Sequence, residues 1–420
     1  MAVQVINRLT GGDAVKGDMS SGAGMAAEDL SKDREFLLET TTGLDPLTDF
    51  LAEHYLSEYI PGGGSKMKFV TGRNGSGKSH FLALMEREAE KRDFLVVSFS
   101  ARELWLHDFK EIYLEILRQC DIERVLAGCA DRIIREMGYD PEQIEKGKNF
   151  MDFLSERGEA DPISRGEIRG LLRNYFTKNP LLDNNFACCC SLLTGGILGH
   201  PVLEAANRDL LLAFLHGDRS VKLAQLRALG LSPSRITKYN SRHLLRSLAQ
   251  VVHLGGWSGI TVFIDDLEML MNRAAGSAMR YTKLRRNDAY ESIRQLIDDI
   301  DNMQYIMFFF GFDRELLDDE NVGMKTYQAL WLRIQNEIVS TRFNKFADIL
   351  DLDRYAQEYY TEEVLAEMSR KMADALEKRG IPARALGREE TAELTERARF
   401  GGIGLPYLVS HAVVCRGEDD

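Results

Sequence analysis

The chain has 420 residues, of which 44% are hydrophobic and 28% charged, a composition typical of a soluble globular protein with enough residues for two or three domains. Its formal net charge of -12 argues against binding nucleic acid through the whole surface but leaves room for a local basic patch. No cationic start precedes an apolar run, and the most apolar strip, residues 305–312, is too short to span a bilayer. We therefore expect a cytoplasmic protein without membrane contact.

The N-terminal part begins with a stretch that has little capacity to form a core. Residues 11–24 are rich in glycine and small polar side chains, so we expect residues 1–33 to be a flexible segment. Further on, Asp45 can cap a helix whose first turn accommodates Pro46. The first ordered element expected in the chain is therefore a helix.

Four apolar runs predict buried strands, at residues 67–71, 94–100, 260–264 and 305–310. A glycine-rich loop and a helix separate the first two. Alternation of this kind favours a parallel sheet flanked by helices, which is an α/β fold.

The remaining sequence is helical in pattern. Residues 108–252 show no clear strand, and residues 362–379 form an amphipathic helix that Thr361 can cap and Gly380 can end. We expect a flexible segment (1–33), the first part of a core domain (34–107), a helical insertion (108–252), the second part of the core (253–350) and a helical, lid-like C-terminal domain (351–420).

The glycine-rich loop has a recognisable pattern. Residues 72–79 read GRNGSGKS and match G-x-x-x-x-G-K-[ST], the P-loop of nucleoside triphosphatases. Its backbone N–H groups would turn inward and bind phosphate oxygens at the positive end of the next helix. Lys78 would reach the β and γ phosphates, and the hydroxyl of Ser79 would hold Mg²⁺. The alternative is a turn that binds nothing. The nucleotide-binding residues expected from the loop are Gly72, Asn74, Gly75, Ser76, Gly77, Lys78 and Ser79.

A P-loop needs an acidic partner to hold the metal and to orient the attacking water. The segment ITVFIDDLE supplies one, since its apolar run ends at Asp265, with Asp266 and Glu268 close behind. We expect Asp265 to be the metal-side carboxylate and Asp266 to polarise the water, with Glu268 as the second candidate base. The alternative is that these acids only favour the start of the next helix.

The strand order along the chain indicates which branch of P-loop proteins this is. Carboxylates at the end of one strand, with a further strand after them, favour the ATPase branch that includes AAA+ proteins (the ASCE class). No guanine-reading N-K-x-D motif follows an apolar strand, so ATP is the expected nucleotide. Asp313, at the tip of the next strand, is a candidate γ-phosphate sensor. Arg333 and Arg342 are candidate arginine fingers, if subunits meet in a homo-oligomer.

Five basic residues and no acid occur between residues 271 and 287. In an acidic protein such a segment is a candidate contact for DNA or an acidic partner, and the alternative is a solvated loop and helix face. The residues concerned are Arg273, Arg280, Lys283, Arg285 and Arg286.

Together, the glycine loop, the block GGWSGITVFIDDLE and the stretch Y-x-A-L-x-x-R at 327–333 resemble a known family, the ATP-binding proteins of prokaryotic BREX anti-phage systems. Members carry GSGKTH where this chain has residues 75–80, which adds His80 to the expected nucleotide-binding residues. They carry IDELE where this chain has residues 264–268, so Asp266 stands where the family usually has glutamate. The resemblance implies an AAA+-like core and defence partners of methyltransferase, phosphatase-like and helicase type.

These observations predict an Mg-dependent ATPase subunit of a phage-defence system that couples its nucleotide state to assembly or remodelling on DNA. The rival hypothesis is a slow nucleotide-dependent switch that regulates protein partners without acting on DNA. A small-molecule kinase is a third reading, but no lid with clustered arginines supports it.

Overall fold

The computed structural model describes residues 34–272, 279–338 and 342–417. The segment 1–33, which we expected to be flexible, and the candidate contact Arg273 both lie outside the described residues.

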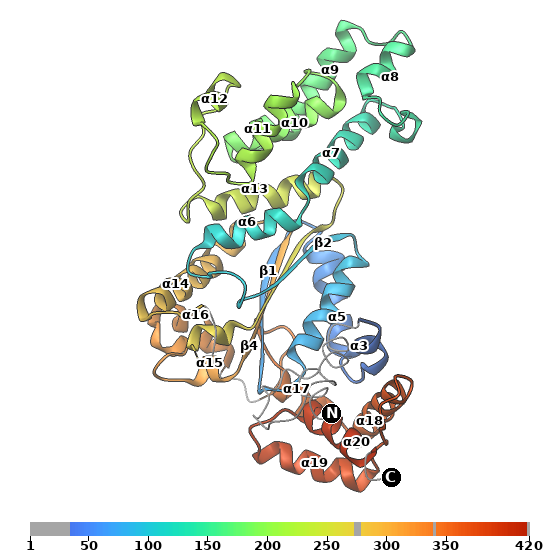
Figure 1. Cartoon of the computed structure of the whole chain (residues 1–420), viewed down its shortest axis with the longest axis vertical. Coiled ribbons are helices and arrows are strands. Elements are labelled where there is room, and N and C mark those ends of the chain that lie inside the picture. Colours follow the sequence, from blue (N-terminus) through green and yellow to red (C-terminus); the bar gives the residue numbers. More distant parts are fainter. Residues whose placement is uncertain (1–33, 273–278, 339–341, 418–420) are drawn as a thin grey trace.

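A five-stranded sheet forms the centre of the molecule (Figure 1). Its order is β2-β3-β4-β1-β5, and every neighbouring pair is parallel. The predicted α/β class with a parallel sheet is therefore confirmed. Because helices cover both faces, the strands read as nearly continuous apolar runs. The strands are β1 (Ser65–Gly72), β2 (Phe94–Ser100), β3 (Gly259–Asp265), β4 (Ile306–Asp313) and β5 (Ile349–Asp351).

The fifth strand corrects the sequence reading, which treated everything after residue 310 as helical. β5 has only three residues, too few to show a periodic pattern, and it pairs with β1 at the edge of the sheet. The fully buried Lys68 of β1 holds the segment that precedes β5. The Nζ atom of Lys68 donates to the carbonyls of Phe346 and Ala347 at 3.0 and 2.7 Å. A short strand is thus held by a side chain of its neighbour.

Alternate residues of each strand face two different hydrophobic clusters, as the pleat requires. In β4, Met307 and Phe309 pack in a cluster with α5 and α4, whereas Phe308 and Phe310 pack in the cluster that contains α6, α13 and α14. The helices next to the sheet are α4 (Asp45–Leu51), which continues as a π-helix (Ala52–Tyr59), α5 (Lys78–Glu90), α14 (Lys283–Asp299), α15 (Glu315–Asp318), α16 (Gln328–Ile338) and α17 (Leu352–Tyr359). Leu44, not Asp45, occupies the N-cap of α4, so the expected capping role of Asp45 is wrong and Asp45 is a first-turn acid.

The chain between β2 and β3 forms a helical lobe that extends away from the sheet, with α6 and α13 nearest to it (Figure 1). Aspartate side chains cap several of its helices, for example Asp108, Asp161 and Asp183. Its helices are α6 (Phe109–Gln119), α7 (Ile122–Glu136), α8 (Phe150–Glu156), α9 (Pro162–Leu172) with a π-helical extension (Arg173–Thr177), α10 (Asn184–Leu198), α11 (Ala205–Leu215), α12 (Leu223–Ala228) and α13 (Ser241–Leu254).

The C-terminal helices form a separate cluster at the opposite end of the molecule (Figure 1). It consists of α18 (Glu362–Glu377), α19 (Arg388–Phe400) and α20 (Leu405–Gly417). The N-terminal helix α3 (Arg34–Thr40) joins it, because Phe36 is buried among these helices and Glu39 pairs with Arg379 at 2.9 Å. Among the described residues, no helix combines the length and hydropathy needed to cross a membrane.

Candidate functional site

The carboxyl ends of the strands bring the predicted site residues to one edge of the sheet. The register pairs Gly72 of β1 with Asp313 of β4, and Ser100 of β2 with Asp265 of β3. This is the edge at which open α/β sheets bind their ligands.

The glycine loop leaves β1 and leads into α5 at this edge, and its residues Gly75 and Ser76 are buried. Gly75 and Gly77 have φ values of 76° and 90°, in the left-handed region that glycine adopts without strain. Gly77 is the N-cap of α5, and a Cβ built on it would have no atom within 4 Å. Gly77, with open space beside it, thus stands at the positive end of α5, and a helix N-terminus of this kind attracts anions.

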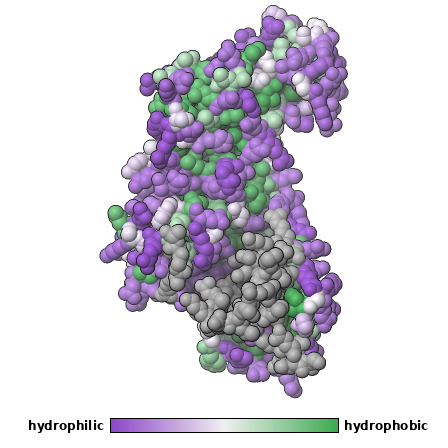
Figure 2. Space-filling view, in the orientation of Figure 1, coloured by the Kyte–Doolittle hydropathy of each residue, from purple (hydrophilic) through white to green (hydrophobic). Residues whose placement is uncertain are grey.

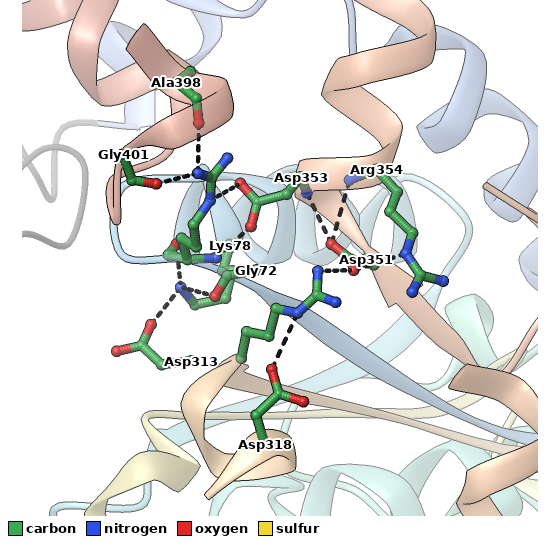
Figure 3. A network of polar contacts seen from close by, with 11 residues as sticks. Gly72, Lys78, Asp313, Asp318, Asp351, Asp353, Arg354, Ala398 and Gly401 are labelled. Carbon is green, nitrogen blue, oxygen red and sulfur yellow. Dashed lines mark hydrogen bonds and ion pairs between the residues drawn. The ribbon is translucent and has the colours of Figure 1, made fainter. Parts of the chain in front are cut away.

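Lys78 lies between the loop and β4. Its Nζ donates to Asp313 Oδ1 at 2.7 Å and to the carbonyls of Gly72 and Arg73 at 3.4 and 3.2 Å (Figure 3). The carboxylate of Asp313 is thus bound to the ammonium group of Lys78, and a phosphate bound to Lys78 would compete with it.

Ser79 and Asp265 meet directly. The Ser79 hydroxyl donates to Asp265 Oδ2 at 2.6 Å, so two hard oxygen ligands lie side by side. Burial raises the pKa of Asp265, and the neighbouring charge of Asp266 raises it further. Gly311 of β4 makes the arrangement possible, because a Cβ there would lie 2.3 Å from Asp265 Oδ1.

Asp266 and Glu268 follow on the loop after β3, and both contact Arg102. Asp266 accepts from the Ser100 hydroxyl at 2.5 Å and pairs with Arg102 at 3.2 Å. Glu268 accepts from the backbone N–H of Asp313 at 3.3 Å and lies 3.6 Å from Arg102. Burial, followed by the charges of Asp313 and Asp266, raises the pKa of Glu268 to about 8.

Three further residues of the expected set lie in or beside the loop. The side-chain oxygens of Asn74 and Ser76 are buried without a hydrogen-bond partner in the described chain, which is costly unless a ligand satisfies them. The Nε2 atom of His80 forms a hydrogen bond of 2.9 Å with the hydroxyl of Thr41. Burial lowers the pKa of the His80 ring to about 4.

The C-terminal helices contact the glycine loop, which the sequence reading did not anticipate. The Arg73 guanidinium donates to the carbonyls of Ala398 and Gly401 and pairs with Asp353 at 3.1 Å (Figure 3). The backbone N–H groups of Gly404 and Tyr407 donate to the carbonyls of Asn74 and Gly75 at 2.8 and 3.1 Å. Residues 401–404 connect α19 to α20, which begins at Leu405.

A second ion-pair group stands beside this contact at the end of β5. Asp351 pairs with Arg314 at 2.8 Å and with Arg354 at 3.3 Å (Figure 3). The sequence signal for Asp351 and Asp353 was present, because ILDLD repeats the pattern of an apolar strand ending in an acid. It was missed because the apolar run has only two residues.

Several predicted residues are not brought to this edge. Arg333 pairs with Asp298 of α14 at 3.0 Å, and Arg342 is exposed. In the basic segment, Arg280, Lys283 and Arg285 are exposed. Arg286 is only 9% exposed, so its guanidinium cannot serve as a surface contact.

Comparison with known proteins identifies one match. A family model described as "BREX system ATP-binding protein BrxC/D" matches residues 37–152 and 183–398, which is more than half of the chain. No curated protein and no solved structure matches the chain.

The raised pKa of Glu268 predicts a pH-dependent stability. The folded state holds this proton up to about pH 8, whereas the unfolded chain releases it near 4.5, so the free energy of unfolding should fall as pH rises between these values. Glu268→Gln carries no such proton. In buffer without metal or nucleotide, we expect it to be more stable than wild type at pH 8.5, by on the order of 1 kcal/mol or more, and to lose this advantage near pH 4.5.

Urea unfolding across this pH range measures the effect, with the exposed Glu393→Gln as the matched control. A Glu268→Gln curve parallel to that of wild type at every pH would contradict the prediction.

Proposed function

The chain belongs to the family of BREX system ATP-binding proteins BrxC/D, and we propose that it hydrolyses ATP at the carboxyl edge of its sheet. In this proposal it is the P-loop ATPase subunit of a phage-defence system and couples its nucleotide state to assembly or remodelling on DNA. The observation that carries the proposal is the contact of Ser79 with Asp265, directly beside Lys78 and the open N-terminus of α5.

The strand order supports an AAA+-like ATPase core. β4 lies between the strand that carries the glycine loop and the strand that carries Asp265, so the two functional strands are not neighbours. An inserted strand at this place is the arrangement of the ATPase branch that includes AAA+ proteins. The division into core (34–107 and 253–350), insertion (108–252) and C-terminal lid (351–420) is part of the proposal, and the contact of residues 401–407 with the loop supports a lid role.

The residues present fit Mg²⁺ together with a nucleotide. A serine hydroxyl and a carboxylate are the protein ligands that Mg²⁺ prefers, with water and phosphate completing its shell. When bound there, the ion would neutralise charge on the β and γ phosphates. The nearby unpartnered oxygen atoms of Asn74 and Ser76 are consistent with a site that is completed by a ligand.

Binding of ATP would rearrange the charges around Lys78. The ammonium group now pairs with Asp313, and a phosphate would have to take over this pair. Release of Asp313 on binding would give the tip of β4 two states, which is what a γ-phosphate sensor requires.

For the chemical step we assign Asp266 to orient the water that attacks the γ phosphorus, with Glu268 as the second candidate. The carboxylate of Asp266 is held by Ser100 and Arg102 and would have to leave at least one of them to reach the water. Its side chain is also one methylene shorter than glutamate. Both features favour slow turnover, and they are the specific support for the rival hypothesis of a nucleotide-dependent switch.

Partners and assembly follow from the proposed function. Other defence-system proteins and a homo-oligomer with Arg333 or Arg342 as arginine fingers are proposals, and Arg333 would have to leave Asp298 to act in this way. Stimulation of turnover by DNA would favour the remodelling ATPase, whereas tight ATP retention with negligible turnover would favour the switch.

Substitutions of the three carboxylates should have separable effects. Asp265→Asn should weaken Mg-dependent ATP binding and turnover together, because it removes a charge from the metal shell. Asp266→Asn should keep ATP bound and lower kcat by about 10²–10⁴-fold, since a residue that orients water acts mainly in the transition state. Asp266→Glu should be as fast as wild type or faster.

Single-turnover hydrolysis at saturating Mg·ATP distinguishes these outcomes, with Glu268→Gln as the control. If Glu268→Gln stops the chemistry and Asp266→Asn does not, Glu268 is the base and the assignment of Asp266 is wrong.

Loss of Arg73 should loosen the lid. Arg73→Ala removes the hydrogen bonds to Ala398 at the end of α19 and to Gly401, together with the ion pair with Asp353, so the amides of Gly404 and Tyr407 should exchange hydrogen faster. A bound fluorescent ATP analogue should dissociate several-fold faster, since the lid would cover it less. Arg314→Ala is the control, because it breaks ion pairs with Asp318 and Asp351 and leaves the hydrogen bonds from Arg73 to Ala398 and Gly401 in place. Equal exchange at these amides in wild type and Arg73→Ala would argue against the proposed role of Arg73 in holding the lid.

A further inference from the structure

The strongest charge asymmetry of the chain lies in the helical insertion, outside the site and outside the basic segment noted above. Residues 219–264 contain seven lysines and arginines and no aspartate or glutamate, although the whole chain has a net charge of -12. The basic residues all fall between 219 and 246, on the segment that connects α11 through α12 to the start of α13.

Most of these side chains face solvent on one edge of the lobe, where Figure 1 draws α12 and its connection to α13 and Figure 2 shows hydrophilic residues interspersed with hydrophobic ones. Arg219, Lys222, Arg235 and Lys238 are exposed, and Arg246 is half-buried. Within the described chain, none of these five makes an ion pair with a carboxylate. We call them, together with Tyr239, the insertion surface.

Several carboxylates near this surface are already engaged. Asp218 accepts from the backbone N–H of Ser220 at 2.8 Å, and Asp299 pairs with Arg242 at 2.8 Å. Asp183 lies 3.9 Å from His243. Asp288 and Glu291 line the smaller hollow beside Tyr239, and Glu291 pairs with Arg294. Asp288 therefore offsets only part of the positive charge of the insertion surface.

The insertion surface also contains one exposed aromatic ring, that of Tyr239. Tyr239 is 80% exposed, and exposing an aromatic ring to water is unfavourable. The ammonium of Lys238 lies 5.4 Å from the centroid of this ring. Tyr239 lines two hollows at once, one with Arg242, His243 and Arg246, of about 290 Å³, and one with His107 and Lys238, of about 90 Å³. A third hollow of about 370 Å³ lies further along the same segment and is lined by Lys110, Arg219 and Arg235.

The basic segment at the start of α14 approaches the same surface. Arg285 stacks on Trp105 with its guanidinium 4.6 Å from the ring centroid. Burial and the charge of Arg285 lower the pKa of His107, Asp108 and Asp288 act against this shift, and Lys238 adds to it from the insertion. Arg285, one of the five residues of the basic segment, thus extends the insertion surface.

We infer that the insertion surface binds single-stranded DNA, with its cations on successive phosphates and the ring of Tyr239 stacked on an unpaired base. Arginine and lysine supply the phosphate contacts, and an exposed ring between cations offers the platform on which single strands stack without sequence preference. A duplex would keep its bases stacked on one another and would leave Tyr239 without a partner, and an acidic protein would not require an exposed ring. The choice of DNA rests on the proposed function, whereas the surface itself does not.

The position in the chain gives this binding a route to the ATP site. Tyr239 is followed directly by α13, α13 leads into β3, and β3 ends at Asp265. Single-stranded DNA bound at the start of α13 would therefore contact a helix that leads, through β3, to the metal-side carboxylate Asp265.

The test measures the fluorescence anisotropy of a labelled 20-nucleotide oligo-dT with the full chain, without nucleotide and over a range of NaCl concentrations. The triple variant Arg219→Glu, Arg235→Glu, Lys238→Glu should bind at least roughly tenfold more weakly, and its slope of log K against log salt should fall by about 2, since each lost phosphate contact to a single strand removes about 0.7. Tyr239→Ala should bind roughly 5- to 100-fold more weakly, whereas Tyr239→Phe should resemble wild type.

The matched control is Arg165→Glu, Arg169→Glu, Arg173→Glu, which makes the same change in net charge on exposed residues of α9 and its extension. Equal loss of binding in the control, no loss in the insertion variant, or no binding of oligo-dT by wild type would overturn the inference. Preference for a 20-base-pair duplex, oligo-rU or polyglutamate, with Tyr239→Ala unchanged, would also overturn it. Lys78→Ala should bind oligo-dT like wild type, so a failure of the ATPase proposal is read separately.

Discussion

The parallel direction of all five strands is the constraint on which the rest of the structure depends. It places five carboxyl ends at one edge, so that Gly72, Ser100, Asp265, Asp313 and Asp351 meet although up to 279 positions of sequence separate them, which is the difference between 351 and 72. Parallel neighbours also need crossovers, and the longest of these is the helical insertion between β2 and β3. The site and the insertion are therefore two consequences of one topology.

Close approach of backbones makes the edge chemically specific. Gly311 has no side chain at the point where β4 passes Asp265, and the carboxylate can therefore lie against the strand and reach Ser79. The acids Asp265, Asp266, Glu268 and Asp313 then lie close together, and burial first, followed by the charges of neighbouring acids, raises the pKa values of Asp265 and Glu268. Under the proposed function, a bound cation would offset this negative charge and would stabilise the folded chain.

The sequence predicted the parts that are written as contiguous patterns. The glycine loop, the four longer strands and the acids after β3 each occupy a short run with a periodic or motif signal, and the structure has strands and loop at these places. The roles of the individual site residues are still predictions. β5, the contact of Arg73 with the turn before α20, and the joining of α3 to the C-terminal helices could not be predicted, because they arise from pairings between distant segments that leave no local periodicity. The basic residues of the insertion were visible in the sequence but are spread over a loop and two helices, and only the fold collects them around Tyr239.

The central claim is that the glycine loop binds ATP through Lys78 with the help of a cation at Ser79 and Asp265. Isothermal titration of ATP into wild type and Lys78→Ala, each with Mg²⁺ and with a chelator, tests it most directly. The account predicts binding to wild type that weakens without Mg²⁺, no measurable binding to Lys78→Ala, and the same unfolding midpoint for both proteins without nucleotide, since Lys78 acts on phosphate and not on the core. Equal affinity of the two proteins for Mg·ATP would contradict it.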